Sequence, residues 1–246
     1  MDPTTILWIA LLMGLAAALY STVGHGGASA YLAVMALFAV APETMRPTAL
    51  ALNLIVAGFG SVRYWWAGQT NFRLLAAFVV TAAPAALLGG TIHISPEFYR
   101  PLVGLLLWAS AARLFWHPSR LAQREPHSPS LAISLPAGAG LGLLAGLTGT
   151  GGGIFLSPLI ILFGWEDARK TSGVVAGFIF INSVAGLAGN WASVRSLPAE
   201  LPILIAAVAA GALVGTWLGA GRLPKPRLLQ GLGLVLAIAG AKLIFT

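Results

Sequence analysis

The architecture of this chain follows from two matching stretches: GLAAALYSTVGHGGASAYLAVM at residues 14–35 and GLLAGLTGTGGGIFLSPLII at residues 142–161. Each stretch passes from an apolar segment through a cluster of glycines into a second, shorter apolar segment. A match of this kind indicates an internal repeat. We therefore predict two related halves, each opening with a broken or re-entrant helix hairpin.

The composition places the chain in a membrane. Of its 246 residues, 58% are hydrophobic and only 9% are charged, against roughly 25% charged in soluble domains. The apolar runs approach the roughly 20 residues that a spanning helix needs, and no alternating pattern typical of barrel strands recurs. The predicted fold class is all-α, a polytopic transmembrane helical bundle. The apolar stretches fall at residues 4–21, 28–41, 47–66, 72–92, 99–116, 131–148, 153–164, 168–192, 199–221 and 226–245.

One polar segment, HPSRLAQREPHSPS, interrupts the apolar pattern at residues 117–130. Its prolines, serines and charges do not pack in lipid. We therefore predict a first membrane repeat at residues 1–116, a cytoplasmic linker at residues 117–130 and a second membrane repeat at residues 131–246.

The basic residues indicate the orientation. If each opening hairpin enters and leaves on one side, each half contributes three full spans and the second half inserts upside down, so the repeats are inverted. This topology places four basic residues on the side of the termini and ten on the other side. If each opening segment were instead a single span, the same 14 basic residues would divide into seven on each side and would give no orientation signal. We predict a multi-pass protein of the bacterial inner membrane with both termini periplasmic, although two complete spans per hairpin give the same sidedness. The four are Arg46, Arg100, Arg195 and Lys242; the ten are Arg63, Arg73, Arg113, Arg120, Arg124, Arg169, Lys170, Arg222, Lys225 and Arg227.

The glycine clusters predict an anion site. Glycine adopts positive φ and lets a ligand approach the main chain, and a helix that restarts after such a turn presents unpaired N–H groups at its positive dipole end. Two such ends meeting near the midplane would replace the water shell of an oxyanion. Close helix packing is the alternative role for these glycines. The predicted substrate-binding residues are Gly24, His25, Gly26, Gly27, Asn53, Gly149, Thr150, Gly151, Gly152, Gly153 and Asn182.

Three side chains in this set have alternative roles. His25 is the titratable group of the clusters, with Thr150 as its repeat counterpart, and could donate to an anion or carry a coupling proton. A neutral histidine bonded to a neighbouring helix is the alternative. Asn53 and Asn182 lie inside the third stretch of each half, where they could line a cavity or bond between helices.

Other functions receive less support. With no cysteine there is no thiolate metal site, and the scattered basic residues do not form a nucleic-acid-binding stripe. We predict no metal, no cofactor, no nucleic-acid partner and no enzymatic activity. An intramembrane hydrolase using Ser21 and His25 is a weaker alternative, because the glycines interrupt the helix that would align the two side chains. An anion channel stays open as a further alternative, and so does a homodimer.

At the glycine clusters the sequence resembles the TauE/SafE family of sulfite exporters, also called the DUF81 or TSUP family. The resemblance implies export of sulfite, or of a related small sulfur-containing or organic anion, across the bacterial cytoplasmic membrane. From the inverted repeats we predict that export proceeds by alternating access, one repeat moving against the other. In one departure, Ala28 stands where the second cluster has a third consecutive glycine, and the second cluster lacks a histidine, so symmetric imidazoles are not available. The residues that carry the likeness are Gly14, Gly24, His25, Gly26, Gly27, Gly146, Gly149, Thr150, Gly151, Gly152, Gly153 and Pro158, with Asn53 and Asn182 in the helices that follow.

Overall fold

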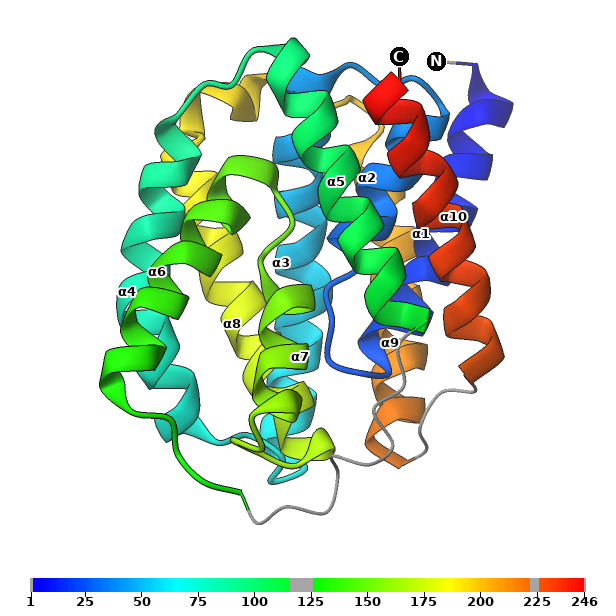
Figure 1. Cartoon of the computed structure of the whole chain (residues 1–246). Coiled ribbons are helices and arrows are strands. Elements are labelled where there is room, and N and C mark those ends of the chain that lie inside the picture. Colours follow the sequence, from blue (N-terminus) through cyan, green and yellow to red (C-terminus); the bar gives the residue numbers. More distant parts are fainter. Residues whose placement is uncertain (1, 116–125, 222–225, 246) are drawn as a thin grey trace.

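The computed structural model describes residues 2–115, 126–221 and 226–245, and these residues form ten α-helices, one 3₁₀ helix and no strand. The predicted all-α class is confirmed. In chain order the helices are α1 (Pro3–Ser21), α2 (Ala28–Leu37), α3 (Pro42–Trp66), α4 (Phe72–Thr91), α5 (Pro96–Phe115), α6 (Leu131–Thr148), α7 (Gly153–Leu162), α8 (Ala168–Gly189), η1 (Trp191–Ser196), α9 (Leu201–Gly221) and α10 (Pro226–Phe245) (Figure 1).

The helix lengths support a multi-pass membrane protein. Six helices of the described residues are long and apolar enough to cross a membrane, namely α1, α3, α4, α6, and most of α8 and α9. The helices α2 and α7 have 10 residues each, which gives a length of about 15 Å, half of a hydrocarbon core. Each glycine cluster therefore joins a full-length helix to a half-length one.

The two hairpins open toward opposite sides of the molecule. The start of α1 and the end of α10 lie at the same end of the bundle, which we call the terminal side (Figure 1). From that side α1 descends and α2 turns back, so the first hairpin opens there. The second hairpin, α6 with α7, starts and ends at the opposite end, near residues 126–130, which we call the linker side. Residues 117–125 of the predicted linker lie outside the described residues.

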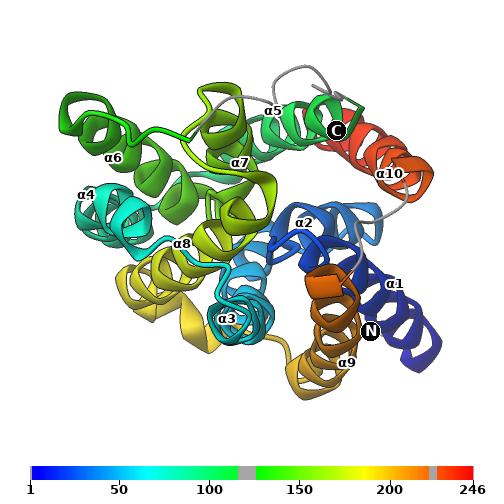
Figure 2. The same ribbon diagram turned by 90° about the horizontal axis from the view of Figure 1, so that it is seen from below.

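Helices of the two halves interlock rather than forming separate bundles. The helix α1 packs on α9, and α6 packs on α4, so the long helix of each hairpin rests on the fourth helix of the other half. The helices α3 and α8 pack together, as do α5 and α10, and Figure 2 shows α3 lying between α8 and α9. Glycines make these contacts close: a Cβ on Gly142 would clash with the main chain of Ala82, and one on Gly211 with that of Gly14.

The basic residues whose side chains are described lie toward both ends of the bundle. Arg46 and Arg100 lie near the starts of α3 and α5, and Lys242 near the end of α10, all toward the terminal side. The linker side holds the ends of the helices that carry Arg63, Arg73, Arg169 and Lys170. The side chains of the other basic residues lie outside the described part of the chain: Arg113, Arg120, Arg124, Arg195, Arg222, Lys225 and Arg227.

Candidate functional site

Two short loops interrupt the hairpins. Residues 22–27, the first glycine loop, join α1 to α2, and residues 149–152, the second glycine loop, join α6 to α7. All of their glycines except Gly26 adopt the left-handed backbone conformation, which residues other than glycine rarely adopt. Both loops therefore need glycine for their turns. The φ angles are 75° for Gly24, 93° for Gly27, 82° for Gly149, 72° for Gly151 and 76° for Gly152.

The helices that follow the loops begin with unpaired donors. Gly27 and Gly152 are the N-cap residues of α2 and α7, and neither helix has a side-chain cap. Among the described residues, no acceptor takes the N–H groups of Gly26, Gly27, Gly151 or Gly152. Both short helices thus present free N–H groups and a positive dipole end inside the bundle.

Tyrosine hydroxyl groups hold the backbone around the loops. Tyr31 Oη donates to the carbonyl oxygen of Gly26 at 2.7 Å. Tyr64 Oη on α3 lies 3.0 Å from the carbonyl oxygens of Ser21 and Thr22, where α1 ends. Before the second loop, Tyr99 Oη on α5 donates to the carbonyl oxygen of Thr148, the last residue of α6, at 3.1 Å. Tyr64 and Tyr99 thus bond carbonyl groups where α1 and α6 end, and Tyr31 bonds one inside the first loop.

The two loops meet between α3 and α8. A Cβ on Gly26 would clash with Asn53 Oδ1 and lie 3.1 Å from Ile179 Cγ2. A Cβ on Gly151 would lie 2.8 Å from Asn53 Nδ2 and 2.8 Å from the same Ile179 methyl group. Asn53 from α3 and Ile179 from α8 therefore both reach both loops. The structure brings Gly26, Gly151 and Asn53 together, although 98 residues separate Asn53 from Gly151 in the numbering of the chain.

Polar side chains at this meeting point are buried without partners. Asn53 and Asn182 are both 0% exposed, and neither amide has a hydrogen-bond partner among the described residues for its oxygen or its nitrogen. Ser183 is also fully buried with an unpaired hydroxyl group, and its Oγ would lie 3.4 Å from a Cβ on Gly151. Asn182 precedes Ser183 on α8, and no contact among the described residues places its side chain against either loop. Each unpaired buried group costs about 1–3 kcal/mol, so such a cluster is typical of a site that a ligand completes.

Each loop also packs on the third helix of the opposite half. A Cβ on Gly24 would clash with the main chain of Ser172 at the start of α8. A Cβ on Gly149 would lie 2.9 Å from the carbonyl oxygen of Arg46 at the start of α3. The same relationship thus occurs at both loops, with the halves exchanged.

Arg46 contacts the second loop at Gly149, but its guanidinium group bonds to the end of α4. Its Nη1 donates to the carbonyl oxygen of Ile92 at 2.9 Å, and its Nη2 donates to those of Gly89 and Gly90 at 2.7 and 2.6 Å. These carbonyl groups end α4, where a cation is favoured by the helix dipole. Arg46 is therefore a cap of α4, and the donors next to Asn53 are neutral groups.

His25 and Thr150 bond within their own loops. His25 is half-buried, its Nδ1 lies 3.0 Å from the carbonyl oxygen of Val23, and its ring lies edge-on to that of Tyr20. The Thr150 hydroxyl lies 3.0 Å from that of Thr148, which donates to the carbonyl oxygen of Leu144 at 2.6 Å. These contacts do not place His25 or Thr150 against Asn53.

The geometry at Ser21 counts against a hydrolase. Ser21 is the last residue of α1, and its Oγ donates to the carbonyl oxygen of Ala17 at 2.6 Å. Its proton is therefore directed into its own helix and away from His25. Nucleophilic catalysis needs that proton to reach a base.

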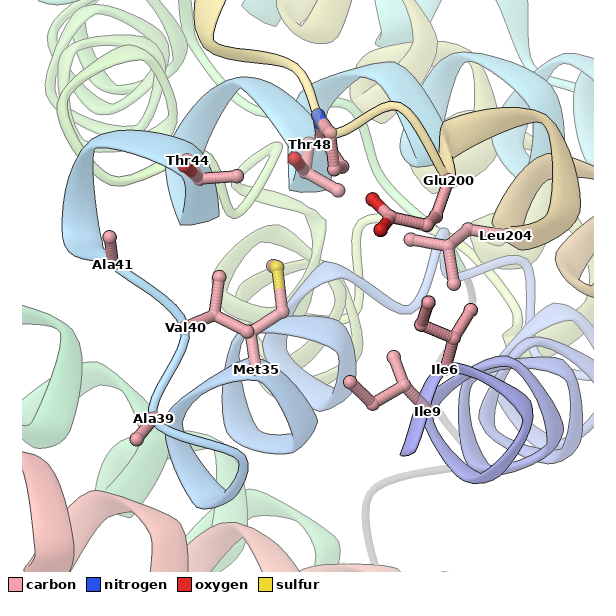
Figure 3. A pocket seen from close by; sticks show the side chains of 11 residues that line it. Ile6, Ile9, Met35, Ala39, Val40, Ala41, Thr44, Thr48, Glu200 and Leu204 are labelled. Carbon is pink, nitrogen blue, oxygen red and sulfur yellow. The ribbon is translucent and has the colours of Figure 1, made fainter. Parts of the chain in front are cut away.

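A cavity of about 260 Å³ enters the bundle from the terminal side. It lies between α1, α2, α3 and the start of α9, and the exposed residues Ala39 and Ala41 stand at its rim. Figure 3 shows the Glu200 carboxylate and the Thr48 side chain both directed toward it. The Thr48 hydroxyl is fully buried and unpaired among the described residues. Thr48 precedes Asn53 on α3 by about 7.5 Å of helix, so the cavity approaches the glycine loops.

Several residues of this region were not predicted from the sequence. Ser183 and Ile179 reach the loops from α8, Thr48 lies at the cavity, and Tyr64 and Tyr99 hold the ends of α1 and α6. The tyrosines carried a usable signal, because a hydroxyl group inside an apolar helix needs a partner. Serine, threonine and isoleucine are common in membrane helices and carried none.

A profile of the family described as sulfite exporter TauE/SafE matches residues 9–243, nearly the whole chain. The chain belongs to the TauE/SafE family. This makes it a member of a family of membrane transporters, as the glycine clusters indicated.

Two relatives extend this finding. A protein of Sinorhizobium fredii named a probable membrane transporter protein is 38% identical over 98% of this chain and 99% of its own length. A Bacillus subtilis protein, also named a probable membrane transporter protein, is 27% identical over 95% of this chain and 98% of its own length. No solved structure matches the chain.

Proposed function

We propose that this TauE/SafE protein exports a small anion, sulfite or a related sulfur-containing or organic anion, through the meeting point of its two glycine loops. The observation that carries the proposal is the Asn53 carboxamide, which is fully buried, lacks a partner among the described residues and lies against both Gly26 and Gly151. A transported ligand would supply the missing hydrogen bonds and would leave the site empty between cycles.

The donors around Asn53 suit an oxyanion. The Asn53 amide nitrogen, the Ser183 hydroxyl group and the free N–H groups of the loops are neutral donors. Fixed dipoles of this kind can replace the water shell of an anion, and helix N-termini favour negative charge. Because no cation sits among these contacts, binding stays weak enough for release. The Ile179 methyl groups on the opposite wall limit the size of the ligand.

The arrangement of the hairpins supports transport by alternating access between two inverted repeats. The first hairpin opens toward the terminal side and the second toward the linker side (Figure 1). Each hairpin packs on helices of the opposite half, and each loop contacts the third helix of that half. A rocking movement of these interlocked halves would expose Asn53 to one side and then to the other. The cavity at Thr48 is the start of a path from the terminal side.

The charge distribution supports export across a bacterial inner membrane. The linker side carries Arg63, Arg73, Arg169 and Lys170, and basic residues are retained in the cytoplasm. The terminal side would then be periplasmic and the linker cytoplasmic. Cytoplasmic basic groups would also concentrate anions at the inner mouth. The proposed path lies within a single chain, so export does not require the homodimer that the sequence left open.

Anion flux in proteoliposomes tests the proposal. The purified chain would be reconstituted and assayed with sulfite, sulfate, sulfoacetate and chloride, beside a Gly26→Leu, Gly151→Leu double variant and a Gly140→Leu control. A Cβ on Gly140 meets no atom within 4 Å, so this control adds the same side chain without crowding the loops. We expect saturable sulfite flux that the double variant loses and the control keeps. Flux that never saturates would favour the channel alternative, and equal flux in all three proteins would reject the site.

A further inference from the structure

An apolar groove of about 890 Å³ runs along the outer surface of α3, between α8 and α9. Figure 2 shows these three helices side by side at the edge of the bundle. Gly58 deepens the floor of the groove because it has no side chain, and Phe180 forms a wall about 3.5 Å from the position of a Gly58 Cβ. The groove lies on the face of α3 that points away from Asn53, so it does not belong to the proposed transport site.

The length of the groove along α3 matches the thickness of one leaflet of a bilayer. Along α3 it extends from Leu54 to Trp66, which corresponds to about 18 Å of helix. Half of a hydrocarbon core is about 15 Å. The groove therefore matches the acyl chain of a lipid in one leaflet, and its deep end lies near the middle of the bundle.

The hydroxyl groups that line the groove already have hydrogen-bond partners and need none from a ligand. Ser61 Oγ donates to the carbonyl oxygen of Ala57 at 2.6 Å, and Thr216 Oγ1 donates to that of Ala212 at 2.7 Å. Both hydroxyl groups are thus satisfied within their own helices. What remains along the walls is hydrocarbon, which suits a hydrocarbon ligand.

The charge is confined to the linker-side end. Arg63 lines the groove there and is exposed, and its side chain makes no hydrogen bond or ion pair with another described residue. Beside it stand Trp66, 75% exposed, and Trp217, 68% exposed. Tryptophan is typical of the level of lipid headgroups, and a guanidinium group pairs bidentately with phosphate. We propose that this groove binds one phospholipid with an anionic headgroup, with one of its two acyl chains along Gly58 and its phosphate at Arg63.

Native mass spectrometry tests this assignment. The intact chain would be reconstituted in vesicles of equal amounts of phosphatidylglycerol, phosphatidylethanolamine and phosphatidylcholine with the same acyl chains, then extracted in mild detergent. We expect one retained lipid per chain with phosphatidylglycerol preferred. Arg63→Gln should lower that preference about fivefold, the effect of one basic group at a charged membrane surface. Arg169→Gln, which removes another exposed linker-side charge, should leave the preference unchanged.

A second variant tests the groove itself. Gly58→Trp should fill the floor and abolish retention of any lipid, while Arg63→Gln should keep a lipid without headgroup preference. Equal retention of the three lipids by the unaltered chain, or a preference for phosphatidylglycerol that survives Arg63→Gln, would overturn the proposal. A dimer mass that disappears in Gly58→Trp would overturn it as well, because the groove would then hold a second copy of the chain.

Discussion

Asn53 Nδ2 lies 2.8 Å from the position that a Cβ atom of Gly151 would take, and it has no hydrogen-bond partner among the described residues. An amide left in this state lowers stability by about 1–3 kcal/mol. We predict that Asn53→Ala abolishes sulfite flux and changes the thermal unfolding midpoint very little, because relief of the buried amide offsets the small cavity. Flux assays and scanning fluorimetry on the same preparation measure both quantities.

Asn71 offers the matched control. Its side chain caps α4 by accepting from the Leu74 N–H at 3.0 Å and donates to the Glu166 carboxylate at 2.6 Å. Asn71→Ala should therefore lower the unfolding midpoint, since loss of a cap costs about 1 kcal/mol, while flux per folded molecule stays normal. If Asn53→Ala behaved like Asn71→Ala, Asn53 would be a structural residue and the proposed site would be wrong.

Gly151 allows a second test of the loop geometry. It has φ 72°, and a Cβ there would press on both Asn53 and Ile179. Gly151→Ala should lower flux at least tenfold and destabilise the protein by more than the roughly 1 kcal/mol that left-handed alanine costs. Gly140→Ala should keep full flux and slightly raise stability, because alanine favours the helix and Gly140 faces open space. Normal flux in Gly151→Ala would show that the second loop lies off the transport path.

The helices and the breaks between them could be predicted from the sequence. Length and hydropathy define α6 and α10 at the expected residues, and the glycine clusters mark where α1 and α6 end. Positive φ at Gly24 and Gly151 follows from local chemistry, so nearby residues suffice to expect it. For the same reason Asn53 could be singled out, since a carboxamide inside an apolar helix is costly.

Contacts between the halves could not be predicted. Ser183 becomes part of the candidate site only because α8 packs on α3, and Ile179 because the same packing turns its methyl group toward Gly26. The sequence also gave Arg46 no role beyond orientation, whereas the structure has it capping α4. Such pairings depend on how helices far apart in the chain rotate against one another, which single-helix patterns do not contain.

The cap that Arg46 forms is open to direct measurement. Its guanidinium group satisfies the carbonyl oxygens of Gly89, Gly90 and Ile92, which methionine would leave unpaired. We expect Arg46→Met to cost about 3 kcal/mol, the value for bonds to a charged group, and to lower the unfolding midpoint by several degrees. Arg169→Met removes an exposed arginine and should have no measurable effect. Equal midpoints for the two variants would contradict the role of Arg46 as a cap.

His25 is the residue with which to test proton coupling. It is the titratable side chain of the first loop, half-buried and bonded to the Val23 carbonyl oxygen through Nδ1. If it carries a coupling proton, sulfite flux should depend on pH through the imidazole group, in addition to the change that protonation of sulfite itself causes in every variant. His25→Gln keeps a donor and should remove the imidazole part of that dependence while leaving flux at the higher pH. An unaltered chain whose flux depends on pH no more than that of His25→Gln would exclude this role.

Sidedness can be measured because the chain has no cysteine of its own. His93 lies in the exposed segment between α4 and α5 on the terminal side, and His127 lies in the exposed segment before α6 on the linker side. In spheroplasts, a maleimide that does not cross membranes should label His93→Cys, whereas His127→Cys should react only after lysis. Both substitutions replace an exposed histidine in a non-helical segment, so each serves as the control for the other. The reversed pattern would place the termini in the cytoplasm, and the cavity at Thr48 would then be an inner mouth rather than an outer one.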